Sequence, residues 1–350
     1  MTKSLNAAIC RVMERGHYIL GPENQAFETA FAGYCGVAHA TAVGSGTDAI
    51  ELALRAIGIR QGEAVATVAN AGFYVTTALL AIGATPLFVD IDPQTYLMSS
   101  SALDRLLGST RTHCVIVTHL YGLLADMDSI LAVCAARQVP VLEDCAQAHG
   151  ATRNGLKAGS FGIAGCFSFY PTKNLGALGD GGAVVTGDDS VAQRISELRQ
   201  YGWVGKYRVV HLGGRNSRLD EMQAAILSAK LPYLDEWNRA RRQIANRYSA
   251  EITNPKIACP AALGADHVAH LYVVRSEERD DLRRHLMSRN ISTGIHYPIP
   301  DHRQPCLSGM PIVAELPHTD CASAEVLTLP CFPEITDAEV DAVIDGLNTW

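Results

Sequence analysis

The sequence lacks the motifs that mark several common classes of protein. No two of its ten cysteines form a C-x-x-C pair, which argues against a zinc ribbon and a thioredoxin-like redox site. There is also no H-E-x-x-H metal motif, no G-x-S-x-G nucleophile elbow and no Walker-type phosphate loop. We therefore expect no metal site, and we expect His267 and His270 to be structural rather than metal ligands.

Long apolar runs and blocks of positive charge are absent too. No stretch approaches the roughly 20 apolar residues that span a bilayer, and the N-terminal segment lacks the apolar core of a signal peptide. The chain has 29 basic and 36 acidic residues, with no basic cluster to neutralise nucleic-acid phosphates. These features predict a cytoplasmic protein that binds neither membranes nor nucleic acid, with its cysteines mostly reduced and buried.

What the sequence does contain is an alternation of strands and helices. Its 350 residues are enough for two to three domains. Short, continuously apolar runs, as expected of strands buried on both faces, lie at residues 63–69, 86–90, 114–118, 139–143, 165–169 and 182–186. A helix is expected between two of them, at 128–137. The alternation predicts a three-layer α/β/α fold with a mostly parallel central sheet.

The pattern changes after about residue 215. Helices are expected over 218–231 and 234–252 with a break or kink at Pro232, followed by a strand at 270–275 and helices at 278–289 and 337–350. We therefore expect a large α/β domain over residues 1–215. Residues 216–350 would form the connecting helices and a smaller C-terminal α+β domain.

Lys173 is the first candidate for catalysis. The chain has only six lysines, and this one follows an apolar strand and a Pro-containing turn, at the strand end where open α/β sheets bind ligands. Burial there would lower its pKa and make the amine a nucleophile able to form Schiff bases. From this segment alone, an ordinary surface lysine in a turn remains the alternative.

The acidic end of the strand expected at 139–143 is a second candidate. Asp144 lies at the carboxyl end of this strand, where a carboxylate can accept a charge-assisted hydrogen bond from a pyridinium N–H. Gln147, three residues on, can reach the same ligand. From these residues alone, Asp144 could equally cap the turn that follows.

Three further segments could bind a ligand or only shape a turn. Residues 43–50 place glycines before a helix whose N-terminus can hold an anion, although a helix cap also explains them. Residues 176–182 are typical of a tight glycine turn. Residues 214–223 gather polar groups at a helix start, where Asn216 or Ser217 could serve only as a cap.

Together and in this order, the segments resemble the DegT–StrS type of nucleotide-sugar aminotransferases, within the fold-type-I pyridoxal-phosphate enzymes. The similarity extends over nearly the whole chain. Its motifs lie at residues 18–22, 45–49, 143–150, 168–176, 179–182, 216–220, 295–300 and 329–330. The resemblance implies an α/β fold like that of aspartate aminotransferase.

The resemblance also implies roles for individual residues. Lys173 would bond covalently to pyridoxal 5'-phosphate and act as general base, and Asp144 would keep the pyridine nitrogen protonated. Gln147 would hydrogen-bond the ring hydroxyl, and Tyr74, or Phe73 as the alternative, would stack on the ring. The phosphate would be bound by Gly46, Thr47 and Ser168, and by Asn216 of the neighbouring subunit. Substrate contacts are expected from Tyr18, Arg218, His296 and Tyr297.

The implied reaction moves an amino group from L-glutamate to a nucleotide-linked keto sugar, with pyridoxamine phosphate between the two half-reactions. A homodimer with shared active sites is implied as well. The segment 295–300, with His302 after it, favours a 3-keto-6-deoxyhexose, for example dTDP-linked. A 4-keto sugar or a cyclitol ketone (inosose) remains open, as do a pyridoxal-phosphate lyase and a non-catalytic regulator that binds the cofactor.

Overall fold

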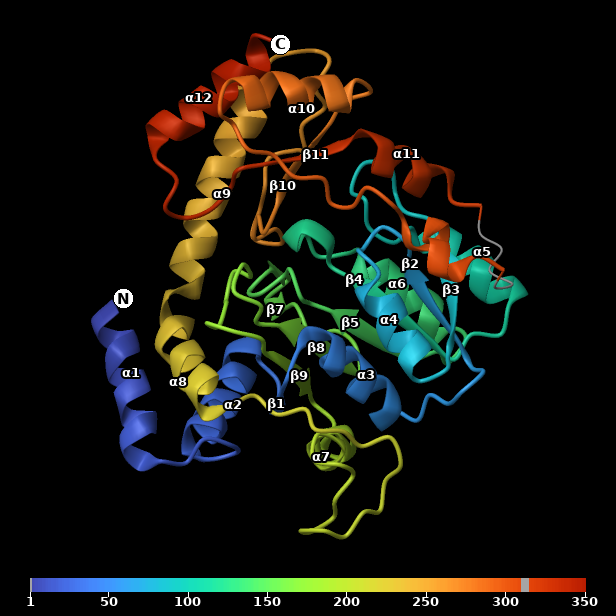
Figure 1. Cartoon of the computed structure of the whole chain (residues 1–350). Coiled ribbons are helices and arrows are strands. Elements are labelled where there is room, and N and C mark those ends of the chain that lie inside the picture. Colours follow the sequence, from blue (N-terminus) through green and yellow to red (C-terminus); the bar gives the residue numbers. More distant parts are fainter. Residues whose placement is uncertain (1, 310–314) are drawn as a thin grey trace.

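The computed structural model describes residues 2–309 and 315–350, and a seven-stranded sheet forms its centre (Figure 1). The strand order is β1-β9-β8-β5-β4-β2-β3. The strands are β1 (His39–Val43), β2 (Ala64–Val68), β3 (Thr85–Val89), β4 (Cys114–Thr118), β5 (Val141–Asp144), β8 (Ala164–Ser168) and β9 (Gly182–Thr186). Strand β9 is antiparallel to both of its neighbours, and the other six strands are parallel.

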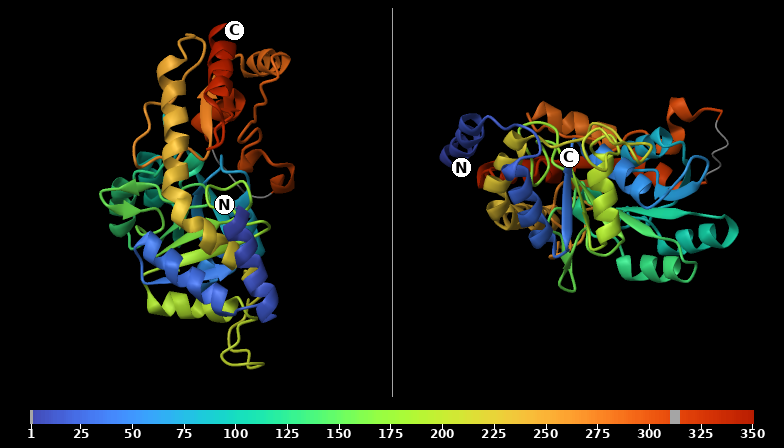
Figure 2. Two further views of the ribbon diagram at one scale, coloured as in Figure 1. Left: turned by 90° about the vertical axis from the view of Figure 1, so that its left-hand side faces the viewer. Right: turned by 90° about the horizontal axis from the view of Figure 1, so that it is seen from below.

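Helices cover both faces of the sheet, because successive side chains of each strand point to opposite sides. Cys114 and Ile116 pack on the face covered by α3 (Gly46–Ala56), α4 (Tyr74–Ala81) and α7 (Asp189–Leu198). Val115 and Val117 pack on the other face, which is covered by α5 (Ser100–Ser109), α6 (Met127–Ala135), α2 (Pro22–Cys35) and α8 (Glu221–Lys230). The predicted three-layer α/β/α fold is thus confirmed (Figure 2).

The expected strands agree closely with the observed ones. The runs at 114–118 and 182–186 coincide with β4 and β9, and the others differ by one or two residues at their ends. Strand β1 is not among the expected strands, because small residues dominate its sequence and form no apolar run. It forms by pairing along its whole length with β9.

The C-terminal part of the chain has its own hydrophobic core. The long helix α9 (Leu234–Glu251) leads to it from α8, separated by a 3-10 turn (Leu231–Tyr233) that contains the expected break at Pro232 (Figure 1). The core joins α9 to α10 (Arg279–Ser288), α12 (Asp337–Asn348) and the antiparallel strands β10 (Tyr272–Arg275) and β11 (Val326–Leu329). Helix α8, by contrast, packs in the core of the sheet. Helix α1 (Thr2–Arg15) packs on α8, α11 (Pro317–Glu325) precedes β11, and β6 (Thr152–Arg153) pairs with β7 (Leu156–Lys157) in a short antiparallel hairpin.

An arm of the chain, residues 201–212, projects from the body between α7 and α8 (Figure 1). Its apolar side chains Tyr207, Val209, Val210 and Leu212 are exposed, and Leu212 is 95% exposed. Such a concentration of exposed apolar groups is typical of an interaction surface.

Across the two described ranges, every helix is too short or too polar to cross a lipid bilayer.

Candidate active site

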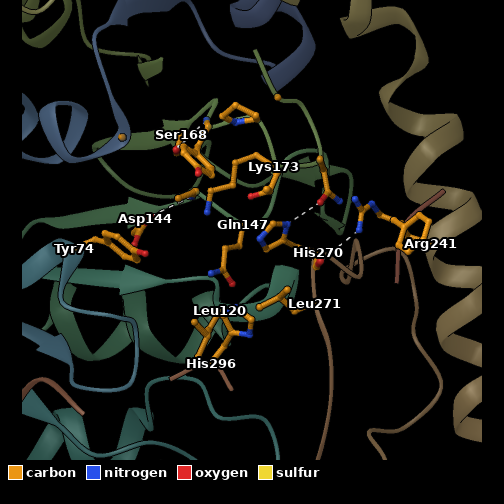
Figure 3. Close-up of a pocket in the computed structure, with 18 of the residues that line it drawn as sticks. Tyr74, Leu120, Asp144, Gln147, Ser168, Lys173, Arg241, His270, Leu271 and His296 are labelled. Carbon is orange, nitrogen blue, oxygen red and sulfur yellow. Dashed lines mark hydrogen bonds between the residues drawn. The ribbon is translucent and has the colours of Figure 1, made fainter. Parts of the chain in front are cut away.

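A cavity of about 1170 Å³ opens at the carboxyl edge of the sheet (Figure 3). Parallel strands present the loops that follow them at this edge, which is where α/β folds bind ligands. The loops after β1, β2, β4, β5 and β8 all contribute to the wall, and the C-terminal part closes the other side. Of the residues expected at the site, those lining this cavity are Gly46, Thr47, Tyr74, Asp144, Gln147, Ser168, Lys173, His296 and Tyr297.

Lys173 lies in the connection between β8 and β9. The Lys173 backbone N–H donates to the carbonyl of Tyr170 at 2.8 Å, and the N–H of Phe169 donates to Gly181 O at 2.7 Å, so the connection is held at both ends. The side chain is half-buried and points into the cavity (Figure 3). Burial lowers the pKa of the Lys173 amine, and the negative charge of Asp144 partly opposes this shift.

Asp144 is the last residue of β5 and is 5% exposed. Its Oδ2 accepts a hydrogen bond from Thr118 Oγ1 at 3.3 Å, and its Oδ1 accepts one from the Ala146 N–H at 3.1 Å. Burial raises the pKa of Asp144, whereas the Ala146 hydrogen bond and the charge of Lys173 lower it. A cationic N–H group brought against this carboxylate would stabilise its ionised form.

The N-terminus of α3 faces the same cavity. Ser45 caps this helix by accepting a hydrogen bond from the Asp48 N–H at 3.1 Å. A Cβ atom on Gly46 would lie 2.7 Å from Cβ of Ser168, so only glycine permits this approach of α3 to the end of β8. The arrangement places the first N–H groups of α3 next to the Ser168 hydroxyl, a combination suited to binding a phosphate.

Gln147 and the two aromatic candidates occupy defined positions. Oε1 of Gln147 accepts from the Tyr121 N–H at 2.6 Å, and Nε2 donates to the Tyr297 hydroxyl at 3.2 Å. Tyr74 lines the cavity, and its ring meets that of Tyr297 edge to face at 6.2 Å. Phe73 instead packs with an apolar cluster that includes Phe88. Of the two residues, Tyr74 is therefore the one whose ring borders the cavity.

Three residues expected at the site do not line the cavity of their own chain. Tyr18 and Asn216 are exposed, and Arg218 lies with its guanidinium carbon 5.8 Å from the ring of Tyr201. The neighbouring Ser217 donates a hydrogen bond to Asp48 at 2.7 Å, which holds this segment beside α3. Within one chain the structure thus gives these three side chains no contact with the cavity.

The sequence interpretation missed Tyr121 and Arg241 and gave His270 only a structural role. The Tyr121 hydroxyl donates to the backbone carbonyl of His296, and so joins the sheet to the segment that carries His296 and Tyr297. Arg241 donates to the Cys331 carbonyl at 2.6 Å and to those of Ala269 and His270 at 3.4 Å. No local motif marks these residues, because each acts on a segment distant in the sequence.

One group in the described part of the chain has the spacing of a metal site: His119, Glu143 and Cys145, all buried. The Glu143 carboxylate is already occupied by three backbone N–H groups of the loop 159–162 and by Nε2 of His119. The Ala125 N–H donates to Nδ1 of His119, so the ring carries its proton on Nε2. These bonds give the group a structural role, namely to hold the loop.

A family model described as the DegT/DnrJ/EryC1/StrS aminotransferase family matches residues 1–348. The chain belongs to this family. Its fold and family thus agree with the expectation from the sequence.

Curated relatives match over almost the whole chain. A dTDP-3-amino-3,4,6-trideoxy-alpha-D-glucose transaminase from Streptomyces venezuelae is 42% identical over 348 residues, covering 99% of this chain and 91% of the relative. A dTDP-3-amino-3,6-dideoxy-alpha-D-galactopyranose transaminase from Aneurinibacillus thermoaerophilus is 44% identical over 349 residues, covering 99% and 95%. A 3-oxo-glucose-6-phosphate:glutamate aminotransferase from Bacillus subtilis is 32% identical over 350 residues, covering 97% and 78%.

Solved structures of the family are similar throughout. DesV of S. venezuelae, in complex with a ketimine intermediate, superposes with a TM-score of 0.95 at 41% identity and covers 100% of this chain and 94% of that one. The structure of ntda from Bacillus subtilis with bound cofactor PMP has a TM-score of 0.93 at 30% identity. The match covers 99% of this chain and 81% of that one. The predictions of enzyme class and cofactor are confirmed: the chain is a pyridoxal-phosphate-dependent aminotransferase.

Proposed function

We propose that the cavity at the carboxyl edge of the sheet holds pyridoxal phosphate through the residues expected from the sequence. The observation that carries this proposal is that the half-buried amine of Lys173 and the buried carboxylate of Asp144 share one cavity. The amine suits a covalent bond to an aldehyde, and the carboxylate suits a protonated ring nitrogen. The N-terminus of α3, with Ser168, is the natural place for the phosphate.

Pyridoxal phosphate, when bound, takes the amino group from a donor and passes it to a carbonyl compound. Lys173 then supplies the proton transfers. Because burial lowers its pKa, more of its amine is unprotonated near neutral pH than in an exposed lysine. It can therefore remove the α-proton of the donor and, in the second half-reaction, deliver a proton to the acceptor carbon that receives the amino group. Asp144 keeps the ring nitrogen protonated, and Gln147 offers an N–H to the ring hydroxyl.

We further propose a dTDP-linked 3-keto-6-deoxyhexose as acceptor and L-glutamate as donor. The products are then the 3-amino sugar and 2-oxoglutarate. Two relatives with more than 40% identity are named as transaminases of dTDP-3-amino sugars, and a third is named for glutamate. His296, whose Nδ1 is 2.8 Å from the Thr328 hydroxyl, and Tyr297 form the wall available to the sugar.

We also propose a cytoplasmic homodimer whose active sites are shared. Asn216, Tyr18 and Arg218 lie outside the cavity of their own chain, so a second copy is needed to bring them to a site. The exposed apolar arm at 201–212 offers a surface for that copy. All ten cysteines lie in the described residues without a disulfide, as suits a reducing compartment.

The test follows the two half-reactions separately. Glutamate should bleach the cofactor absorbance of the purified protein, whereas aspartate and alanine should act more slowly. The aminated enzyme is then given 3-keto and 4-keto dTDP sugars and an inosose, and the products are identified by mass spectrometry. An amino group at C3 of the dTDP sugar supports the proposal; amination of only the 4-keto sugar or the inosose contradicts it.

A further inference from the structure

His270 is a buried polar residue of the cavity wall that the proposed mechanism does not use. It precedes β10 and is 8% exposed. Its segment is fixed to the sheet by backbone hydrogen bonds, from Val268 N–H to Gly122 O at 2.9 Å and from Leu271 N–H to Tyr121 O at 3.2 Å. The ring borders the cavity on the same side as Leu120 and Leu271 (Figure 3).

A chain of hydrogen bonds determines which ring nitrogen carries the proton. The Asn238 side-chain amide donates to the carbonyl of His149 at 2.8 Å, so its Oδ1 is the acceptor for Nδ2 of Asn174, also at 2.8 Å. Nδ2 of Asn174 donates as well to the Val268 carbonyl at 3.0 Å. The remaining atom of that amide, Oδ1, can only accept, and it lies 3.0 Å from Nδ1 of His270. The proton is therefore on Nδ1.

The other ring nitrogen, Nε2, is left as a bare acceptor. Burial keeps the pKa of His270 well below its ordinary value, and the facing Lys173, Arg241, His149 and His296 add to this effect, so the ring is neutral at pH 7. Among the described residues, the one hydrogen bond of the His270 ring is that at Nδ1, and neither Lys173 nor another protein group donates to Nε2. Nε2 is not among the fully buried side-chain atoms that lack a partner, so it faces the cavity, where a ligand or a water molecule can donate to it.

We propose that Nε2 of His270 accepts a hydrogen bond from a hydroxyl group of the keto sugar and thereby selects the sugar against the amino donor. This inference rests on the proposed function, because it assumes a polyhydroxylated acceptor. The carboxylates of an amino-acid donor have no hydrogen to donate, and their negative charge would be repelled by the lone pair on Nε2. The donor's amine is engaged in the reaction itself, so a sugar hydroxyl is the group that remains.

Two substitutions separate the acceptor from the structural hydrogen bond. His270→Asn places an amide nitrogen where Nδ1 stands, so the bond to Asn174 is kept and the acceptor at Nε2 is lost. His270→Gln carries a carbonyl oxygen out to the Nε2 position and gives up the bond to Asn174. If His270→Asn fails to fold, the His270→Gln variant still reports on the acceptor.

Stopped-flow measurements of each half-reaction on the holoenzyme test the proposal. In His270→Asn the glutamate half-reaction should stay within about 2-fold of the wild type. With the aminated enzyme, kcat/KM for the keto sugar should fall roughly 10- to 100-fold, as for loss of one hydrogen bond to a buried group. His270→Gln should recover part of this loss. A dTDP sugar lacking the recognised hydroxyl should react equally with wild type and His270→Asn.

Equal losses in both half-reactions, or no loss in either, would overturn the proposal. A wild-type enzyme that reacts with glutamate but with no keto sugar would instead contradict the proposed function. Nitrogen NMR of the wild-type holoenzyme, with the His270 signal assigned by its absence in His270→Asn, gives a readout other than activity. A proton on Nδ1 and an Nε2 resonance that moves when the amino-sugar nucleotide binds are expected; a proton on Nε2 would refute the inference.

Discussion

Asp301 is hydrogen-bonded to Thr76, whose hydroxyl donates to the Asp301 carboxylate at 2.5 Å. The N–H of Phe73 donates to the same carboxylate at 2.9 Å, and the Asp301 N–H donates to the Ala69 carbonyl at 2.7 Å. Asp301 thereby joins the segment that carries Tyr297 to the start of α4, where Tyr74 lies. It positions two aromatic residues of the cavity without lining the cavity itself.

Burial raises the pKa of Asp301 to about 6, which makes its contribution to stability depend on pH. The folded state binds this proton more tightly than the unfolded state, so the contribution is largest at low pH and is lost as pH rises from about 4 to 6. Relative to Asp301→Asn, the wild type should lose up to about 3 kcal/mol of unfolding free energy over that interval. Urea denaturation of both proteins at pH 4.5 and 7 measures the difference. Burial lowers the pKa of His149 to about 3, so its contribution to stability has the opposite pH dependence. This contribution is the same in both proteins and cancels in the comparison. A constant difference between the variants would contradict the expectation.

Replacing Lys173 by Ala should reduce turnover by about 10³-fold or more while the fold persists. The variant lacks the amine that bonds to the cofactor and transfers protons. Borohydride treatment followed by peptide mass mapping should label a peptide that spans residue 173 in the wild type only. Lys256→Ala is the matched control, since Lys256 is exposed and pairs with Glu278 at 3.1 Å. Normal turnover in Lys173→Ala would remove Lys173 from the mechanism.

Asp144→Asn should reduce kcat by roughly 10²- to 10³-fold, since a neutral amide cannot stabilise a charged ring nitrogen. The substitution should also lower the pKa of Lys173, because Asp144 is the group that raises it. The pH dependence of the rate at which the cofactor-free protein reacts with added pyridoxal phosphate reports this second effect. Asp128→Asn, at an exposed position of α6, serves as the control. An unchanged titration in Asp144→Asn would show that the two groups are not coupled.

Gly46→Ala should weaken the binding of pyridoxamine phosphate by about 10-fold or more. Its Cβ would lie 2.7 Å from Cβ of Ser168, and an overlap of this kind costs about 1–3 kcal/mol. Equilibrium dialysis measures the affinity without relying on activity. In Gly33→Ala the new Cβ meets nothing within 4 Å and lies in α2, so this control should bind normally and be slightly more stable. Equal affinities in both variants would place the phosphate elsewhere.

Hybrids of Lys173→Ala and Asn216→Asp chains test the shared sites. Each variant alone should be inactive. Random mixing should restore about one quarter of wild-type activity, because half of the dimers are hybrids and each hybrid contains one complete site. Light scattering checks that the mixture consists of dimers. No recovery in verified hybrids would mean that Asn216 serves its own chain or no site at all.

The parts of the site that could be predicted from the sequence are those that follow a strand directly. Asp144 ends β5, and Lys173 lies in the connection after β8, so a buried strand pattern with a polar residue at its end was sufficient to mark both. The same reasoning predicted most strands of the sheet. It missed β1, whose existence depends on β9, about 140 residues further along the chain.

The role of His270 depends on contacts that no local pattern encodes. From the sequence, His267 and His270 were both expected to be structural. In the structure Nδ1 of His267 accepts from the Ala269 N–H at 3.0 Å, a local contact, whereas His270 is oriented by Asn174, 96 residues earlier. Similarly, Tyr121 reaches a carbonyl 175 residues away. Packing between the sheet and the C-terminal part therefore determines that the side chain of His270 lines the cavity.

The antiparallel direction of β9 has a consequence for how Lys173 can move. Its connection leaves one strand and returns along the adjacent one, so both ends are locked in the same ladder of hydrogen bonds. The connection is also held internally, because the Lys173 N–H donates to Tyr170 O at 2.8 Å and the Ala177 N–H donates to Phe169 O at 2.8 Å. With its backbone held in this way, the amine reaches donor and acceptor by rotation about its own methylene groups, so the same anchored residue can serve both half-reactions.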